Sequence, residues 1–168
     1  METCKFCGKE FSNTKPYRKN ICRECHNSKN KIVQRRRAST VEGYFKMILN
    51  DIKNNPRRNK YENDIDLEYL MKLYDKQDGR CAISNIKMTW GFSDGEEENK
   101  QFRKPYNIGI DRVDNSIGYI EGNVVLVCNI VNFFKSNNSL DIVYHVAEEI
   151  TKNKNRLAEV QAMKQEIK

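Results

Sequence analysis

The segment 107–135 constrains the fold more than any other part of the chain, because its pattern changes from strand to turn to strand to helix. Residues 108–111 alternate isoleucine with small or polar residues, which predicts a short strand that ends at Asp111. The stretch 112–123 combines glycines with Asp, Asn and Ser, a composition typical of a turn. Residues 124–127 are aliphatic and mostly β-branched, and they predict a buried second strand.

A helix is predicted to follow the second strand from Cys128. Its apolar positions fit a little more than one helical turn and are Ile130, Val131, Phe133 and Phe134. Asn132 falls on the face opposite part of that stripe. A hard divalent cation prefers oxygen ligands, and Asp111 and Asn132 would supply one carboxylate and one amide oxygen from elements that pack together. The sequence therefore predicts a site for one Mg²⁺ or Mn²⁺ ion between the first strand and this helix.

At these residues the chain resembles the HNH endonucleases, a family also described by its ββα-metal or His-Me finger motif. The resemblance covers roughly residues 67–136. It is most specific at Asp111-Arg112, Gly118-Tyr119, Asn123, Val127-Cys128, Asn132 and Lys135. It implies an α+β fold with a ββα-metal core and flanking helices. In that core, Asp111 and Asn132 would bind the metal, and Asn123 would hold the loop and orient the base.

One residue departs from the family pattern. Members of the family usually carry His directly after the Asp, as the base that activates water, whereas this chain has Arg112. An arginine stays protonated at neutral pH, so Arg112 is expected to stabilise charge on the phosphate and not to accept a proton. A subset of the family, which includes a rare-cutting restriction enzyme, is similar in having Asp-Arg here. The departure is therefore compatible with an active enzyme, but the base must come from elsewhere.

Few side chains are candidates for that base. The two histidines are His26, which follows a cysteine pair, and His145, which lies in a helical stretch far from the motif. Tyr74 is the better candidate, because a phenol near an arginine and a metal would have a lowered pKa. Its helical spacing with Leu70 and Met71 indicates a core aromatic in the first place, and a catalytic role is the alternative.

Four of the six cysteines form two CxxC pairs, and these are Cys4 with Cys7 and Cys22 with Cys25. Two such turns complete a tetrahedral shell of thiolates, so we expect one closed, structural Zn²⁺ ion. A disulfide is the alternative, and the intracellular context disfavours it.

The other two cysteines are Cys81 and Cys128. Many members of the family that the chain resembles carry CxxC at both places, where this chain has Ser84 and Val131 as the second members. Two thiolates alone hold a structural zinc poorly. We therefore expect two buried, reduced thiols that pack near each other, with Val131 in the place of a lost ligand.

Positive charge is concentrated near the N-terminus. The chain of 168 residues has a net charge of +7, and residues 1–37 alone carry 11 Lys or Arg against 3 acidic residues. Such a patch attracts polyanions, and DNA or RNA is the expected one, although a solvated face is the plain alternative. The residues expected to contact DNA are Arg35, Arg36, Arg37, Arg57, Arg58 and Lys135.

The remaining organisation follows from helix signals. A capping box at Ser39 and Glu42 predicts a helix up to Asn54, and a second helix is expected from about 66 to 77. Residues 91–106 form a polar, acidic insertion that is expected to be a loop, and a helix is predicted from Ser139 to the end. Its apolar side would carry Leu140, Val143, Ala147, Ile150, Leu157 and Val160.

These elements divide the chain into a Cys4 zinc module with a basic extension (1–37), a nuclease-like domain (38–138) and a C-terminal helix (139–168). We find no apolar run long enough to span a bilayer and no signal-peptide core, and we expect an intracellular protein, in a bacterial or virus-infected cell. A homodimer would suit a cutter of palindromes, and a monomer would suit a nicking enzyme.

The resemblance implies a metal-dependent endonuclease that hydrolyses phosphodiester bonds in double-stranded DNA. Restriction and homing are the roles that family analogy suggests, and such enzymes are often encoded by phages. The main alternative is a zinc-ribbon DNA-binding protein whose HNH scaffold has decayed, and the missing histidine favours it. A nuclease that processes RNA or recognises DNA structure would share the same site.

Overall fold

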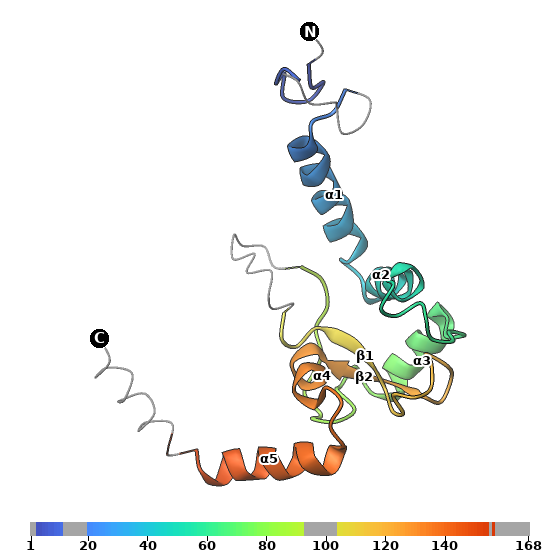
Figure 1. The fold of residues 1–168 in the computed structure, drawn as a ribbon, viewed down its shortest axis with the longest axis vertical. Helices are drawn as coiled ribbons and strands as arrows, with labels where there is room; N and C mark the ends of the chain where they lie inside the picture. Colours follow the sequence, from blue (N-terminus) through green and yellow to red (C-terminus); the bar gives the residue numbers. More distant parts are fainter. Residues whose placement is uncertain (1–2, 12–19, 93–103, 155, 157–168) are drawn as a thin grey trace.

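The computed structural model describes residues 3–11, 20–92, 104–154 and 156. These residues form a mixed fold of helices and strands, which agrees with the predicted α+β class (Figure 1). In chain order the elements are α1 (Arg23–Arg37), α2 (Val41–Asn54), α3 (Leu67–Lys76), β1 (Ile108–Arg112), β2 (Val124–Cys128), α4 (Asn129–Lys135) and α5 (Leu140–Lys152).

The two strands pair in an antiparallel hairpin, with Ile110 opposite Leu126 and Asp111 opposite Val125. The first strand runs one residue beyond its predicted end, so that it includes Arg112. Because side chains alternate along a strand, Ile108 and Ile110 leave one face of the sheet and Gly109 and Asp111 leave the other. The hairpin therefore presents an apolar face and a face that carries the carboxylate.

Helices α2 and α3 supply the core that receives the apolar face. Phe45, Ile52, Leu70 and Leu126 have no exposed surface, and Ile110 is 4% exposed. Burial of each such side chain contributes about 1.5–3 kcal/mol. Helix α4 packs on the other face, where Asn132 and Lys135 reach the strand. The sheet is thus held between the α2–α3 pair and α4.

The ends of α2 and α3 follow local capping chemistry. Thr40, and not Ser39, caps α2, since the Thr40 hydroxyl accepts a hydrogen bond from the Gly43 N–H at 3.1 Å. The predicted box of Ser39 and Glu42 is wrong by one residue, because the Ser39 hydroxyl donates back to the Arg36 carbonyl at the end of α1. Helix α3 has Asp66 as its N-cap and Gln77 as its C-cap, which agrees with the predicted range of about 66 to 77.

The basic stretch before α2 is a continuous helix, which the sequence analysis did not predict. Helix α1 runs from the second cysteine pair to the three arginines and buries none of its residues. It begins at Cys22, whose sulfur accepts a hydrogen bond from the Cys25 N–H at 3.4 Å. In Figure 1 it rises away from the sheet and carries the N-terminal cysteines with it.

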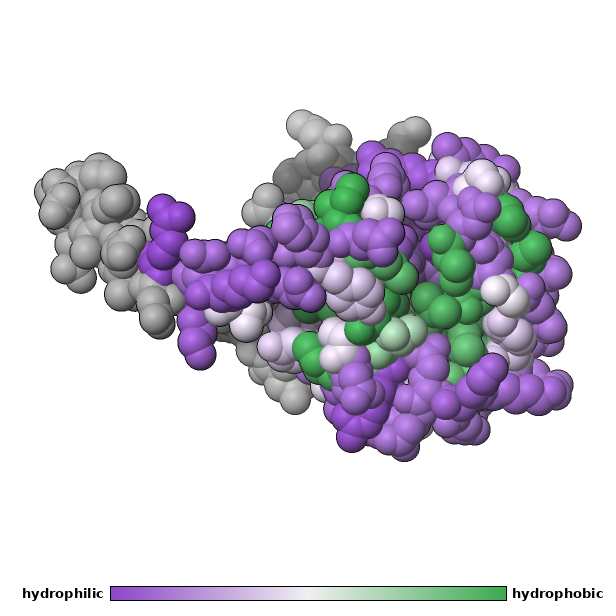
Figure 2. All heavy atoms as spheres, turned by 90° about the horizontal axis from the view of Figure 1, so that it is seen from below, coloured by the Kyte–Doolittle hydropathy of each residue, from purple (hydrophilic) through white to green (hydrophobic). Residues whose placement is uncertain are grey.

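Helix α5 begins as predicted but does not bury its predicted apolar side. Ser139 caps it, yet Val143 is the only buried residue among the described residues of that side, while Leu140 is 41% and Ile150 is 60% exposed. The packing prediction was wrong for these residues because most of the helix runs along the lower edge of the molecule, away from the sheet (Figure 1). Figure 2 looks at the molecule from this side and shows apolar residues among hydrophilic ones.

Two expectations fall partly or wholly outside the described residues. Leu157 and Val160 lie beyond them, as do residues 93–103 of the acidic insertion. In the part of the chain that is described, no helix is long and apolar enough to cross a membrane.

Candidate functional site

A buried ion pair joins β1 to α4. The Lys135 ammonium lies 3.1 Å from one carboxylate oxygen of Asp111 and 3.4 Å from the other. Both side chains are only 7% exposed. Lys135 was predicted as a DNA contact, but the structure turns its charge inward, so its partner is a carboxylate of the chain itself.

Asn132 lies one helical turn before Lys135, on the same face of α4. Its amide nitrogen donates to the Ile110 carbonyl at 3.4 Å, next to Asp111 in the strand. Gly109 makes this approach possible, because a Cβ there would come within 3.0 Å of the Asn129 side chain and 3.4 Å of Asn132. The structure therefore places Asn132 against the strand residue next to Asp111, and these are the two residues predicted to bind a metal.

The donor set at this junction fits a hard divalent cation, since it offers a carboxylate and amide oxygens. The Asp111 carboxylate is buried and its charge is already compensated by Lys135. A cation bound by Asp111 would have to share that carboxylate with the Lys135 ammonium or displace it. The residues are thus suited to the ion, with Lys135 as its competitor.

Asn123 clamps the loop between the strands. Its amide nitrogen donates to the carbonyls of Asp114 and Gly118, at 3.0 and 2.9 Å, and its oxygen accepts from the Asp114 N–H at 2.9 Å. All these bonds lie within the loop and the start of the second strand. The arrangement matches the predicted role of Asn123 in holding the loop.

Arg112 leaves the strand on the face opposite Asp111 and stacks on two tyrosines. Its guanidinium carbon lies 3.8 Å from the centre of the Tyr61 ring and 5.3 Å from that of Tyr119. One guanidinium nitrogen donates to the Ile117 carbonyl at 2.8 Å. These contacts fix the positive charge of Arg112 at the end of β1, beside the loop that Asn123 holds.

Tyr61 is the site residue that the sequence analysis missed. Its hydrogen bond with Arg112, followed by the positive charge of Lys60, lowers the pKa of the Tyr61 phenol. Lys60 itself lies over the Tyr61 ring at 5.0 Å. A tyrosine within a basic loop was the available signal, but the contact with Arg112 depends on the tertiary fold.

Tyr74, the predicted candidate for the base, lies elsewhere. Its ring packs edge-on against Phe45 and Trp90, with ring centres 6.1 and 6.4 Å away. Burial raises the pKa of the Tyr74 phenol, and the charges of Asp75 and Asp78 add to this effect. The observations favour the core role that its helical spacing indicated.

The four N-terminal cysteines form a cluster that can hold one metal ion. The sulfur atoms of Cys4, Cys7, Cys22 and Cys25 all lie within 4.8 Å of one another. Backbone N–H groups, that of Cys22 first, lower the pKa of Cys4 to about 6, whereas hydrogen bonds with the other thiols raise that of Cys25 to about 12. A set of four sulfur ligands at this distance is the arrangement of a closed structural site.

The other two cysteines are buried thiols in contact, as predicted. Cys81 is 2% exposed and Cys128 is fully buried. The Ser84 N–H donates to the Cys81 sulfur at 3.5 Å, and burial together with the charge of Cys81 raises the pKa of Cys128 to about 12. Val131 packs against the same core.

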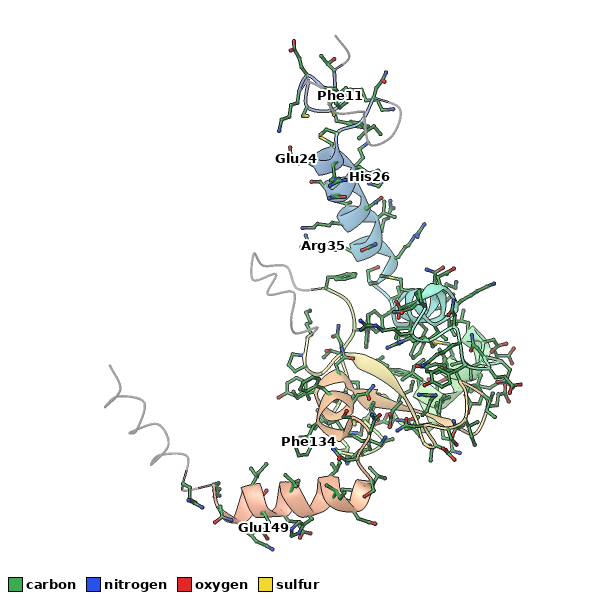
Figure 3. All side chains as sticks on the ribbon, in the orientation of Figure 1. Phe11, Glu24, His26, Arg35, Phe134 and Glu149 are labelled. Carbon is green, nitrogen blue, oxygen red and sulfur yellow. The ribbon has the colours of Figure 1, made fainter. Side chains whose placement is uncertain are left out.

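The arginines expected to contact DNA lie in the last turn of α1 and in the loop after α2. Arg35 and Arg36 lie in the last turn of α1, where Figure 3 labels Arg35. Arg57 is exposed in the loop after α2. Arg37 and Arg58 line a groove between α2 and β1, and Arg58 also forms an ion pair with Asp51 at 3.4 Å.

No family model matches the chain, and neither a curated protein nor a solved structure matches it. The resemblance to the HNH endonucleases therefore rests on the motif residues themselves.

The buried ion pair can be tested by a double-mutant cycle. Lys135→Met and Asp111→Asn should each lower the free energy of unfolding by about 3–5 kcal/mol, because each leaves a buried partner without compensation. The double variant should lose less than the sum of the two, measured by urea unfolding. Lys152→Met is the control, since it breaks an exposed pair with Glu149 and should change stability by less than about 1 kcal/mol. Strictly additive losses would contradict the pair.

The cysteine cluster predicts one zinc ion per chain. Metal analysis of the purified chain should give one equivalent, and Cys7→Ser should lose most of it because three thiolates leave the shell incomplete. Cys81→Ala, which removes a thiol outside the cluster, should keep the full equivalent. Equal zinc content in both variants would assign the metal to another place.

Proposed function

We propose that the chain is a metal-dependent endonuclease of the HNH type that hydrolyses phosphodiester bonds in double-stranded DNA. The observation that supports this best is the packing of α4 on β1, where Asn132 contacts the carbonyl of Ile110, the residue next to Asp111. Their residue types, their places at the end of a strand and on a following helix, and the loop held by Asn123 together match what the motif requires.

Asp111 and Asn132 are the residues that would hold one Mg²⁺ or Mn²⁺ ion, whose chemistry is to polarise the scissile phosphate and to stabilise the leaving oxygen. Arg112 supplies a fixed positive charge at the end of β1, where it stabilises the extra charge on the phosphate. Asn123 keeps the loop beside Arg112 in one conformation. The cluster of Cys4, Cys7, Cys22 and Cys25 binds a structural Zn²⁺ ion, and this ion orders the N-terminal segment ahead of α1.

Tyr61 is the best candidate for the group that accepts a proton from the attacking water. It contacts Arg112, which follows Asp111 directly in the strand, and its pKa is lowered by that contact. A phenol with a lowered pKa has a larger fraction of phenolate at neutral pH than an ordinary tyrosine. Tyr61 takes the role first considered for Tyr74.

The main alternative is a zinc-ribbon DNA-binding protein with a decayed HNH scaffold. One observation favours it: the Asp111 carboxylate is neutralised by Lys135 within the fold. In such a protein the ion pair would be purely structural, and the basic α1 would provide the binding surface.

Plasmid cleavage separates the two proposals. With Mg²⁺ or Mn²⁺, the chain should nick or linearise supercoiled plasmid, and Asn132→Ala should lower the rate by a factor of about 100 or more while plasmid binding persists. Asn153→Ala, in an exposed amide at the end of α5, is the control. A wild-type chain that shifts the plasmid without cutting it supports the DNA-binding protein instead.

The proposed base predicts a pH dependence. Since the pKa of Tyr61 is lowered, phenolate accumulates as pH rises toward that pKa, so the cleavage rate should rise with pH and level off above it. Tyr61→Phe should lower the rate by about 100-fold or more and remove this rise. Tyr74→Phe should keep the wild-type profile, because Tyr74 lies in the core away from Arg112. An unchanged profile in Tyr61→Phe would exclude Tyr61 as the base.

A further inference from the structure

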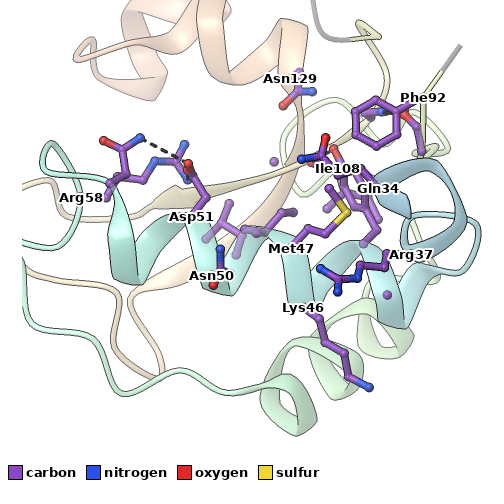
Figure 4. A pocket seen from close by; sticks show the side chains of 18 of the residues that line it. Gln34, Arg37, Lys46, Met47, Asn50, Asp51, Arg58, Phe92, Ile108 and Asn129 are labelled. Carbon is purple, nitrogen blue, oxygen red and sulfur yellow. Dashed lines mark hydrogen bonds and ion pairs between the residues drawn. The ribbon is translucent and has the colours of Figure 1, made fainter. Parts of the chain in front are cut away.

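A groove of about 1290 Å³ lies between α2 and β1 and reaches the proposed metal site. Its walls come from α2 on one side and from Ile108 to Ile110 with α4 on the other (Figure 4). Arg37 and Phe92 lie at one end of the groove. Asn132 is part of its lining, so the groove and the Asp111 site share a residue.

The lining has the chemistry of a surface for nucleic acid. Arg37 and Lys104 contribute positive charge, whereas Arg58 is paired with Asp51, the one acidic residue among the described lining residues. Lys46 also borders the groove, but its amine points away in Figure 4 and pairs with Glu42. Seven lining side chains are amides, which can both donate to and accept from base edges. Positively charged side chains can contact the phosphates of a nucleic acid, and amide side chains can hydrogen-bond to its bases.

The volume of the groove fits a short ligand. Pockets that enclose a drug-sized molecule measure roughly 300–1,000 Å³, so a groove of about 1290 Å³ has room for a few nucleotides of one strand.

Phe92 adds an argument for unpaired bases. It is 44% exposed and lies at the groove, beside the end of α1. An exposed aromatic ring is a platform on which an unpaired base can stack, whereas bases inside a duplex already stack on their neighbours.

We infer that this groove binds one unpaired DNA strand and leads it toward Asn132. The preferred substrate is then a duplex with a single-stranded branch, and not an uninterrupted duplex. The branch lies along the groove, with phosphates near Arg37 and Lys104 and a base on Phe92, while the duplex stays outside. The part of this inference that concerns cleavage rests on the proposed nuclease function, whereas the part that concerns binding does not.

Fluorescence anisotropy without Mg²⁺ or Mn²⁺ tests the binding directly. The full chain is titrated with a short labelled oligothymidylate, with a blunt duplex and with a forked duplex that carries one oligothymidylate arm. The fork should bind about tenfold more tightly than the blunt duplex. Phe92→Ala should weaken binding of the oligothymidylate about tenfold, the size of one lost stacking contact, and should leave the blunt duplex unaffected.

Charge variants provide a second readout. Arg37→Ala and Lys104→Ala should each reduce the salt dependence of oligothymidylate binding, by about 0.7 in the slope of log K against log salt. Lys72→Ala is the matched control, because Lys72 is an exposed lysine on α3 that pairs with Glu68 away from the groove. It should leave both the affinity and the slope unchanged.

The outcomes separate the groove from the nuclease proposal. Equal affinity for fork and blunt duplex, or unchanged oligothymidylate binding in Phe92→Ala, would overturn the inference whether or not the chain cuts DNA. Loss of fork binding in the groove variants would support it even if Asn132→Ala proved that Asn132 has no part in cleavage. In groove variants that bind the fork weakly, the rate of fork cleavage should fall by the same factor as the affinity for the fork.

Discussion

The ion pair between Asp111 and Lys135 connects the two elements on which the rest of the site depends. Helix α4 has only seven residues, too few to be stable alone, so its position must come from contacts with the sheet. Taking both charges out of water is costly, and their attraction offsets that cost only while they remain together. The pair therefore fixes the register of α4 on β1, and with it the approach of Asn132 to Ile110. The carboxylate that the proposed function needs is the same one that holds this junction.

The alternation of side chains along β1 divides the site into two halves. Asp111 faces α4, where the oxygen donors gather, and Arg112 faces Tyr61 and Tyr119 on the other side of the strand. A phosphate bound at the end of the strand could reach both halves, since the two residues are neighbours in the chain. In the proposed function, the groups assigned to metal binding and to proton transfer are therefore on different faces of the strand.

The N-terminal cysteine cluster stands apart from this site. Helix α1 carries it away from the sheet, and none of the residues of α1 is buried (Figure 3). A helix without a buried face gains little from packing, so contacts with α2 hold its end, and a metal ion in the cysteine cluster would order its start. In the proposed function, this arm would lie along DNA while the groove and the β1–α4 junction receive one strand.

The sequence by itself determined the local elements. Alternation and turn residues predicted the two strands and their loop, Asp66 and the apolar spacing predicted α3, and the paired cysteines predicted the cluster. The resemblance to the HNH motif also gave Asp111, Asn123 and Asn132 as candidate site residues. These signals are local because strand and helix periods, turn chemistry and ligand spacing involve residues close together in the chain.

Only the tertiary structure decided which partners these residues meet. Lys135 was predicted to contact DNA, but its ammonium pairs with the carboxylate of Asp111, 24 residues earlier in the chain. Tyr61 meets Arg112, whereas Tyr74 meets Phe45, although both tyrosines precede the motif. The apolar stripe of α5 has a helical period yet finds no surface to cover beyond Val143. In each case the outcome depends on how elements distant in sequence pack, and burial, charge compensation and the pKa of a side chain are properties of that packing.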